Sequence, residues 1–265
     1  MNTKILKITA VLLIVAIVGC EKNEMHKSVD SEINIRMVEI FDNSPRTLQM
    51  HFSTTKIYPC CNYPIDLSWK KTSNSIEISF NGVIETDLCL TALGPATAII
   101  DFGTLGNGTY QLIFQNGEVK YSGQLVVSSD SYKVNFGSNS EFSFANALLN
   151  KMPENTIWGY VGYHKQETST LVQSFLDDLL SLGANEKLYL PGDYREFEIA
   201  ENGKIVQPDA TSGYYFARSF VFQYSGDIAK VEQLVEQYAH DYGTEYMYIG
   251  VYTDKGNQIL SWMYK

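Results

Sequence analysis

Long apolar runs, basic residues and histidines are scarce in this chain of 265 residues, and each scarcity narrows the range of functions. The apolar run at residues 8–18 is about half of the roughly 20 residues that a membrane-spanning helix needs, and no other run approaches that length. Basic residues number 20 against 30 acidic ones. Because nucleic-acid binding depends on Lys and Arg that neutralise phosphates, we expect no nucleic-acid partner.

Recognisable catalytic motifs are also missing. No two histidines stand at helical metal-ligand spacing, and the chain has no Gly-x-Ser-x-Gly turn, phosphate-binding Gly-rich loop or calcium loop. Glu196 and Glu198 share one face of a predicted strand, and this alternation is typical of a solvated face. We therefore predict no catalytic residues, no metal site and no cofactor, and a function other than that of an enzyme.

The N-terminus has the pattern of an export signal. Lys4 and Lys7 precede the apolar run, which ends at Ile17-Val18-Gly19-Cys20 and is followed by polar residues. This stretch resembles the lipobox of bacterial lipoproteins, in which the chain is cut before the Cys and the Cys carries the lipid. The resemblance implies a signal peptide at 1–19, lipidation of Cys20 and attachment to a membrane of the cell envelope. Residues 20–265 would carry 18 basic and 30 acidic residues, a net charge of about −12.

Residues 20–31 form a polar tether behind the predicted anchor. In the Bacteroidota, an acidic run directly after the lipidated Cys resembles a surface-export signal. Here Lys22 and Asn23 separate Glu21 from Glu24, so the match is partial. The resemblance favours the outer membrane and leaves open whether the protein faces the surface or the periplasm.

Three further cysteines predict one disulfide bond, because exported proteins fold in an oxidising compartment. A bond between Cys60 and Cys61 would be strained, since adjacent Cα atoms lie about 3.8 Å apart. Cys89 is therefore expected to pair with either Cys60 or Cys61. Side chains of neighbouring residues in a strand point to opposite faces, so only one of the two reaches Cys89.

Residues 32–136 alternate between apolar and polar positions in short runs separated by turns, which predicts an all-β sandwich. Asn81-Gly82 and Asn116-Gly117 follow strand-like runs and indicate hairpin turns. The stretch from Gly106 to Leu112 resembles the start of strand F in immunoglobulin-like domains. There a Tyr forms the tyrosine corner, and Tyr110 matches it. Residues 137–155 are predicted to be a linker, with a short helix at 144–149.

Residues 156–265 follow a different pattern. Apolar residues recur at helical spacing in 171–180 and 228–238, with Thr168 and Asp227 as predicted N-caps. Strands are predicted around these helices, including one at 194–200. The order β-α-β-β-α-β with a final strand is the ferredoxin-like pattern. The sequence thus predicts a mixed fold, an N-terminal immunoglobulin-like sandwich followed by a C-terminal α+β ferredoxin-like domain.

An aromatic face is the candidate binding site of the second half. Strand alternation puts aliphatic residues on the side covered by the helices and aromatic residues on the opposite side. Those aromatic residues are Trp158, Tyr160, Tyr246, Tyr248 and Tyr252. The register of the Phe216, Phe220 and Phe222 set is left open. Either the molecule covers this face itself, or the face binds a partner, since Tyr and Trp are common in binding hot spots.

These observations favour a lipid-anchored, non-enzymatic binding or adhesion module for a glycan or protein partner. One alternative is a hydrolase of envelope or nutrient polymers, with catalytic residues brought together from distant positions. Another is a structural or inhibitory subunit of an envelope complex.

Overall fold

The computed structural model describes residues 28–41, 45–90, 92–206, 213–243 and 246–264. In these residues the protein is mostly β, with three sheets and two α-helices, and it is mixed α/β overall. Neither helix is long and apolar enough to cross a membrane. The strands are β1 Ile33–Ile40, β2 Thr47–Tyr58, β3 Ile65–Lys71, β4 Ser75–Val83, β5 Gly94–Asp101, β6 Gly108–Asn116, β7 Val119–Val127, β8 Ser131–Phe136, β9 Phe142–Phe144, β10 Leu148–Asn150, β11 Thr156–Tyr163, β12 Gly192–Asp193, β13 Glu198–Ile199, β14 Phe216–Gln223, β15 Met247–Thr253 and β16 Gln258–Leu260. The helices are α1 Ser169–Ser181 and α2 Ile228–Tyr242, with short 3₁₀ turns at Gln166–Thr168 and Ser261–Tyr264.

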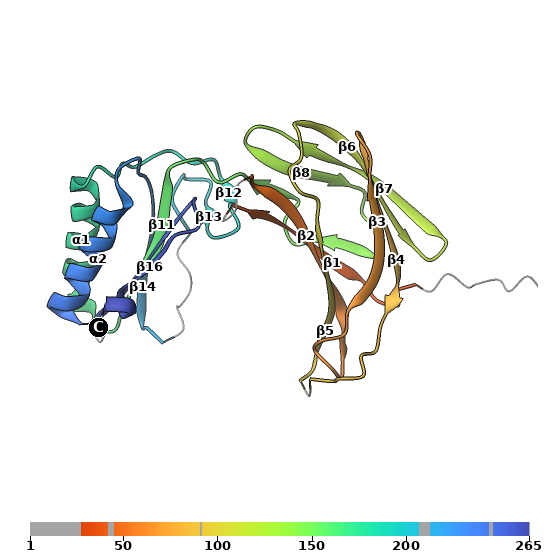
Figure 1. Ribbon diagram of the computed structural model, residues 1–265, viewed down its shortest axis with the longest axis horizontal. Coiled ribbons are helices and arrows are strands. Elements are labelled where there is room, and N and C mark those ends of the chain that lie inside the picture. The colour runs from red at the N-terminus through yellow and green to blue at the C-terminus, as the bar shows by residue number, and fades with distance from the viewer. Residues whose placement is uncertain (1–27, 42–44, 91, 207–212, 244–245, 265) are drawn as a thin grey trace, which may run out of the picture.

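The N-terminal half consists of two sheets that enclose one apolar core (Figure 1). The first sheet has the order β5-β2-β1-β9, and the second has the order β13-β12-β10-β8-β7-β6-β4-β3. Inward-facing residues of both sheets alternate with outward-facing ones, as in the burial pattern of β4. Phe52 of the first sheet contacts Phe80 and Phe114 of the second at ring-centroid distances of 5.5 and 6.5 Å. This aromatic contact is the centre of the core.

Of the two hairpin turns predicted in this half, the structure contains one. Asn116-Gly117 does form the β6–β7 hairpin, with Gly117 at a φ of 60° that favours glycine. The hairpin prediction at Asn81-Gly82 is wrong, because these residues lie inside β4 beside a β-bulge in the pairing with β3. The helix predicted at 144–149 is wrong too, because residues 142–150 provide β9 and β10 to the two sheets. The Tyr110 hydroxyl donates to the Gly106 carbonyl oxygen at 3.1 Å.

The third sheet, in the order β14-β11-β15-β16, has both helices on one face (Figure 1). Apolar residues of α1 and α2 pack on alternate residues of β11, β14 and β15. Asp227 caps α2, since its Oδ1 accepts from the Ala229 N–H at 3.0 Å. Thr168 makes no such side-chain bond and instead ends the 3₁₀ turn before α1. Helical spacing therefore predicted both helices and both N-cap positions, although only Asp227 makes a capping hydrogen bond.

The strand predicted at 194–200 is not part of the third sheet. Only Glu198–Ile199 of this segment is extended, as β13, and it pairs with β12 at the edge of the second sheet. Beside β14, at its outer edge, Asn185 forms an isolated bridge to Gln223. The chain between α1 and β14 thus leaves the third sheet and returns to the N-terminal half. As a result β12 and β13 lie between the two halves (Figure 1).

Buried and partly buried polar contacts join the halves at this junction. Arg46 pairs with Asp254 at 3.3 Å and also donates to the Met152 carbonyl. Arg195 donates to the Glu39 carbonyl at 2.9 Å. The Glu39 side chain is only 2% exposed, and its Oε2 accepts from the Met152 N–H at 2.8 Å. The two halves are thus fixed by contacts between segments far apart in the sequence.

A disulfide bond joins Cys60 to Cys89, across a sequence separation of 29 residues. Cys61 is the free thiol of the described residues and is half-buried. Its Cβ lies 2.7 Å from the position of a Cβ added to Gly94. This packing directs Cys61 toward the start of β5 and leaves Cys60 to face Cys89.

We predict that the double variant Cys60→Ser/Cys89→Ser lowers the free energy of unfolding by roughly 3–4 kcal/mol, the chain-entropy value for a loop of this length. Urea denaturation of the oxidised wild type and the variant measures the difference. Cys61→Ser is the matched control and should change stability by less than about 1 kcal/mol. An equal loss in both proteins would contradict the assignment.

Glu39 predicts a pH dependence of stability. Burial raises the pKa of its carboxyl above the ordinary value, against the opposing effects of the Met152 hydrogen bond and the nearby cations. The contribution of a group with a raised pKa is complete below its unfolded pKa and is lost as pH rises through its folded pKa. In Glu39→Gln, the free energy of unfolding relative to wild type should therefore increase between pH 4 and pH 7. Urea titrations across this range test it, with the exposed Glu118→Gln as control. Parallel pH profiles for wild type and Glu39→Gln would refute the effect.

Candidate functional site

The predicted aromatic face is the helix-free side of the third sheet. Ile157, Val161 and Tyr163 of β11 pack in the helix-side core, whereas Trp158 and Tyr160 point to the opposite side. The aliphatic residues of β15 follow the same alternation. The assignment of sides on β11 and β15 is therefore confirmed.

The sequence left open whether the Phe residues of β14 join the aromatic face, and the structure shows that they do not. Phe220 and Phe222 belong to the helix-side core, and Phe220 contacts Phe175 of α1 at 6.2 Å. Phe216 stacks on Tyr163 at 5.3 Å. The Phe set is therefore directed toward the helices. On the other side of β14, Val221 packs with the aromatic residues.

One end of the aromatic face is covered by the protein itself. Trp158 is 6% exposed and packs against Phe41, which follows β1, with ring centroids 5.6 Å apart. The chain between α1 and β14 supplies the rest of the cover, and Phe197 from it lies 6.1 Å from the Trp158 ring. Tyr252 stacks on Trp158 at 6.2 Å and is half-buried at the border of this cluster. Trp158 is thus a core residue and not an open binding residue.

The other end of the face carries three half-buried tyrosines, Tyr160, Tyr214 and Tyr248, which we call the tyrosine face. Tyr248 lies 5.5 Å from Tyr160 and 5.9 Å from Tyr214, measured between ring centroids. Tyr214 in turn stacks on His164 at 4.9 Å. Rings from β11, β15 and the residue pair before β14 therefore form one continuous surface. Tyr246, also predicted for this face, is 52% exposed and precedes β15.

Gly162 gives Tyr214 its place on this surface. A Cβ added to Gly162 would lie 2.8 Å from two atoms of the Tyr214 ring, closer than side chains pack. The ring therefore rests directly on the backbone of β11. Sequence reasoning missed Tyr214. The available signal was the glycine itself, since Gly inside a strand often marks a close approach of another group.

The hydroxyls of Tyr248 and Tyr214 on the tyrosine face have raised pKa values. Burial raises the pKa of Tyr248, and the neighbouring Tyr160 and Tyr252 raise it further. Burial and Tyr160 also raise the pKa of Tyr214. These hydroxyls stay protonated at neutral pH and can donate and accept hydrogen bonds. The surface offers ring faces and neutral hydroxyls to a ligand.

The other residues considered from the sequence do not join this site. Glu196 and Glu198 are exposed, and Glu196 pairs with Arg195 at 3.0 Å. His51 contacts Gln49 on β2, and His240 lies exposed near the end of α2. Within the described ranges no three His, Cys, Asp or Glu side chains come together as a metal-binding group. Cys20 lies outside the described residues.

Comparison of the chain with protein-family models, with curated proteins and with solved structures gives no match.

We predict that Trp158→Ala destabilises the protein by about 3–5 kcal/mol, the usual cost of emptying a large aromatic site in a core. The loss is measured by thermal or urea unfolding. Tyr242→Ala, which removes a 43% exposed ring on α2, should cost about 1 kcal/mol or less. Similar small losses for both would mean that Trp158 is not a core residue.

Proposed function

We propose that this protein is a lipid-anchored cell-envelope protein that binds saccharide chains through the tyrosine face, without catalysing a reaction. The observation that carries the proposal is the continuous surface of Tyr160, Tyr248 and Tyr214 at the end of the aromatic face that Trp158 and its cover leave free. Sugar rings present apolar C–H faces edged by hydroxyls. Tyr rings offer a complementary apolar face and a hydrogen-bonding end.

Attachment to an envelope membrane rests on the resemblance of the N-terminus to lipoprotein signals. The polar tether behind Cys20 would let the folded part stand away from the lipid. We infer attachment to the outer membrane from the partial acidic signal that follows Cys20. A binding module benefits from attachment to the membrane, because the attachment keeps the module close to ligands in the cell envelope.

We also infer that the two halves are variants of known architectures. The two facing sheets and the hydrogen bond from Tyr110 to Gly106, four residues upstream, support an immunoglobulin-like sandwich. The split β-α-β arrangement of β11, α1, β14, α2 and β15 supports a ferredoxin-like relative. In this variant the strand expected beside β14 is reduced to the Asn185 bridge.

A saccharide is favoured over a charged ligand by the chemistry of the site. The tyrosine face is built from neutral groups, and the chain as a whole has a formal net charge of −10. Anionic ligands are therefore repelled at long range. A protein partner buried against the tyrosines is the second candidate, because Tyr is common in interface hot spots.

We predict that Tyr248→Ala and Tyr160→Ala each weaken binding of neutral oligosaccharides by about tenfold or more, the loss expected of a hot-spot residue. A glycan array with bacterial-envelope and plant oligosaccharides identifies the ligand, and calorimetry with the best binder measures its Kd. Tyr248→Phe keeps the ring and should lose less affinity than Tyr248→Ala. Tyr242→Ala removes an exposed ring on the helix side and is the control.

Unfolding curves of the variants are recorded in parallel, so that loss of fold is separated from loss of binding. No binding by the wild type to any oligosaccharide, or equal affinities of the wild type and Tyr248→Ala, would contradict the proposal.

A further inference from the structure

A second exposed surface lies at the far end of the sandwich, around the disulfide bond. Leu88 is 74% exposed, Leu90 52% and Leu93 78%, although all three are large and apolar. Ile57 at the end of β2 and Ile84 after β4 add exposures of 57% and 48%. We call these five residues the leucine tip. A group of exposed apolar side chains often marks a site of contact with a membrane or with another protein.

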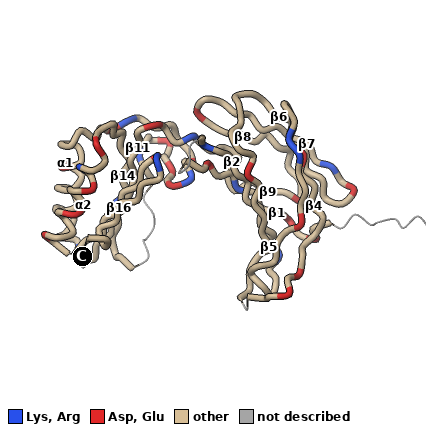
Figure 2. Tube along the Cα trace, viewed as in Figure 1, with Lys and Arg blue, Asp and Glu red and all other residues tan. Residues whose placement is uncertain are grey.

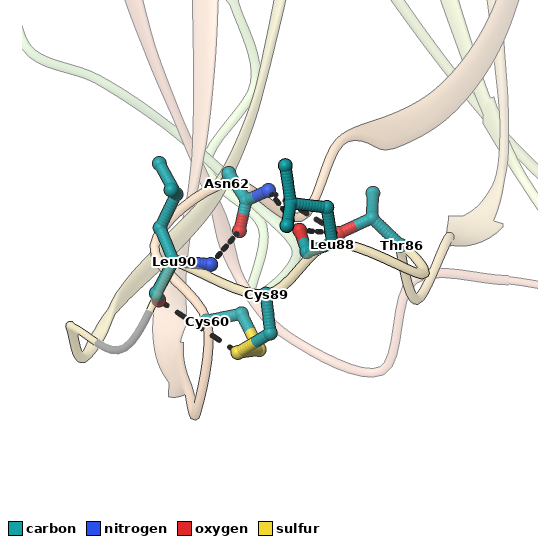
Figure 3. The surroundings of a disulfide bond; sticks show 6 residues. All are labelled: Cys60, Asn62, Thr86, Leu88, Cys89 and Leu90. Carbon is teal, nitrogen blue, oxygen red and sulfur yellow. Dashed lines mark hydrogen bonds between the residues drawn. A yellow bond between two sulfur atoms is a disulfide. The ribbon is translucent and has the colours of Figure 1, made fainter.

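The leucine tip is held in a defined shape. Cys89, between Leu88 and Leu90, is bonded to Cys60, and Asn62 binds the same loop (Figure 3). The Asn62 amide nitrogen donates to the Leu88 carbonyl at 2.7 Å, and its oxygen accepts from the Leu90 N–H at 3.1 Å. A loop fixed at both leucines does not fold back to bury them. The disulfide bond and the hydrogen bonds of Asn62 thus hold these side chains at the surface of the protein.

The N-terminal segment leaves the sandwich at the same end. Ile33, the first residue of β1, pairs with Thr54, and Asp30 forms an ion pair with Lys56 at 3.6 Å. Lys56 is the residue before Ile57 of the leucine tip. Seven residues, 21–27, separate Cys20 from the first described residue, and the eight Cα–Cα steps of this stretch span at most about 30 Å when extended. A membrane that holds Cys20 therefore lies within reach of the tip.

We propose that the leucine tip inserts into the headgroup region of the bilayer that holds the Cys20 lipid, and that this second contact sets the orientation of the protein on the membrane. The inference rests on the proposed anchoring at Cys20. A lipid on Cys20 holds the chain at one point only, and a second apolar contact adds membrane affinity and restricts the rotation of the folded part. Glu85 and Asp87 lie on the same loop and would repel an anionic surface, so the proposal assigns a zwitterionic bilayer surface. Figure 2 shows acidic positions near β5.

The test uses the full lipoprotein, purified from membranes and reconstituted in phosphatidylcholine vesicles with or without brominated acyl chains. Leu93→Trp carries the probe. Interfacial side chains lie about 5–10 Å deep, so brominated lipid should lower the added fluorescence of Trp at 93 by about half or more. Ile99→Trp is the matched control. Ile99 is 60% exposed, and it lies on β5 about 13 Å further along the strand than Pro95, the partner of Ile57. Its added fluorescence should not change.

A third variant combines Leu93→Trp with Leu88→Ser and Leu90→Ser. Brominated lipid should quench its added fluorescence much less than that of Leu93→Trp alone, because the remaining tip is too polar to stay inserted. Unquenched Trp at 93 would overturn the proposal, whether the tip then lies in water, against a second copy or against a protein partner. Equal quenching at positions 93 and 99 would overturn it as well.

Lipidation of Cys20 is measured separately, by mass spectrometry of the N-terminal fragment. If Cys20 is lipidated and the fluorescence of Leu93→Trp is not quenched, insertion of the leucine tip is refuted and the lipid anchor stands. If Cys20 is unmodified and added vesicles quench the fluorescence of Leu93→Trp, the lipid anchor is refuted and insertion of the leucine tip stands.

Discussion

Trp158 packs edge-on against Phe41, and this contact brings a residue of the third sheet against the end of the first. Around it lie Met152 and the tyrosines of the chain between α1 and β14, which together form an apolar cluster separate from the two main cores. Arg46 and Asp254 close the same junction with a partly buried ion pair. Without this cluster the helix-free face of the third sheet would be open along its whole length. With it, the face is divided into a structural end and a tyrosine end.

That division limits how much aromatic surface meets water. The largest ring, Trp158, is used to join the halves, and only tyrosines remain at the partly open end. A Tyr hydroxyl keeps its hydrogen bonds with water when no ligand is present, which an exposed Trp or Phe face cannot do to the same degree. The helix-free side also faces the sandwich (Figure 1). A ligand on the tyrosines therefore lies in the angle between the two halves, where approach from one side is restricted.

Local patterns predicted much of this fold, and the failures share a cause. Alternation and helical spacing located most strands and both helices, because each depends on one buried face of one element. Asn81-Gly82 misled because β4 continues past it to pair with β3 through a bulge, which only the partner strand reveals. The segment at 194–200 alternates like a strand, but alternation does not say which sheet a strand joins. Its placement decides the burial of Trp158, so the candidate site could be predicted only in part.

The choice between Cys60 and Cys61 also depends on a contact with a residue distant in sequence. Both precede β3 and have identical chemistry, and only the close approach of Gly94 to Cys61 separates them. Tyr214 was likewise visible only through a contact, its ring on the backbone at Gly162. Residues whose role comes from a neighbour distant in sequence leave a weak local trace, usually a glycine.

The short strands β12 and β13 have a mechanical consequence. They come from the C-terminal half of the chain but extend the second sheet, so residues 137–155 are not the sole connection between the halves. A load pulling on the third sheet is shared among the main chain, the pairing of β12 with β10 and the hydrogen bonds from Asn146 to Met37 and Asp193. Several connections in parallel resist bending better than a single hinge. Under the proposed anchoring at Cys20, a pull on the tyrosine face would pass through several connections between the halves and not through a single hinge.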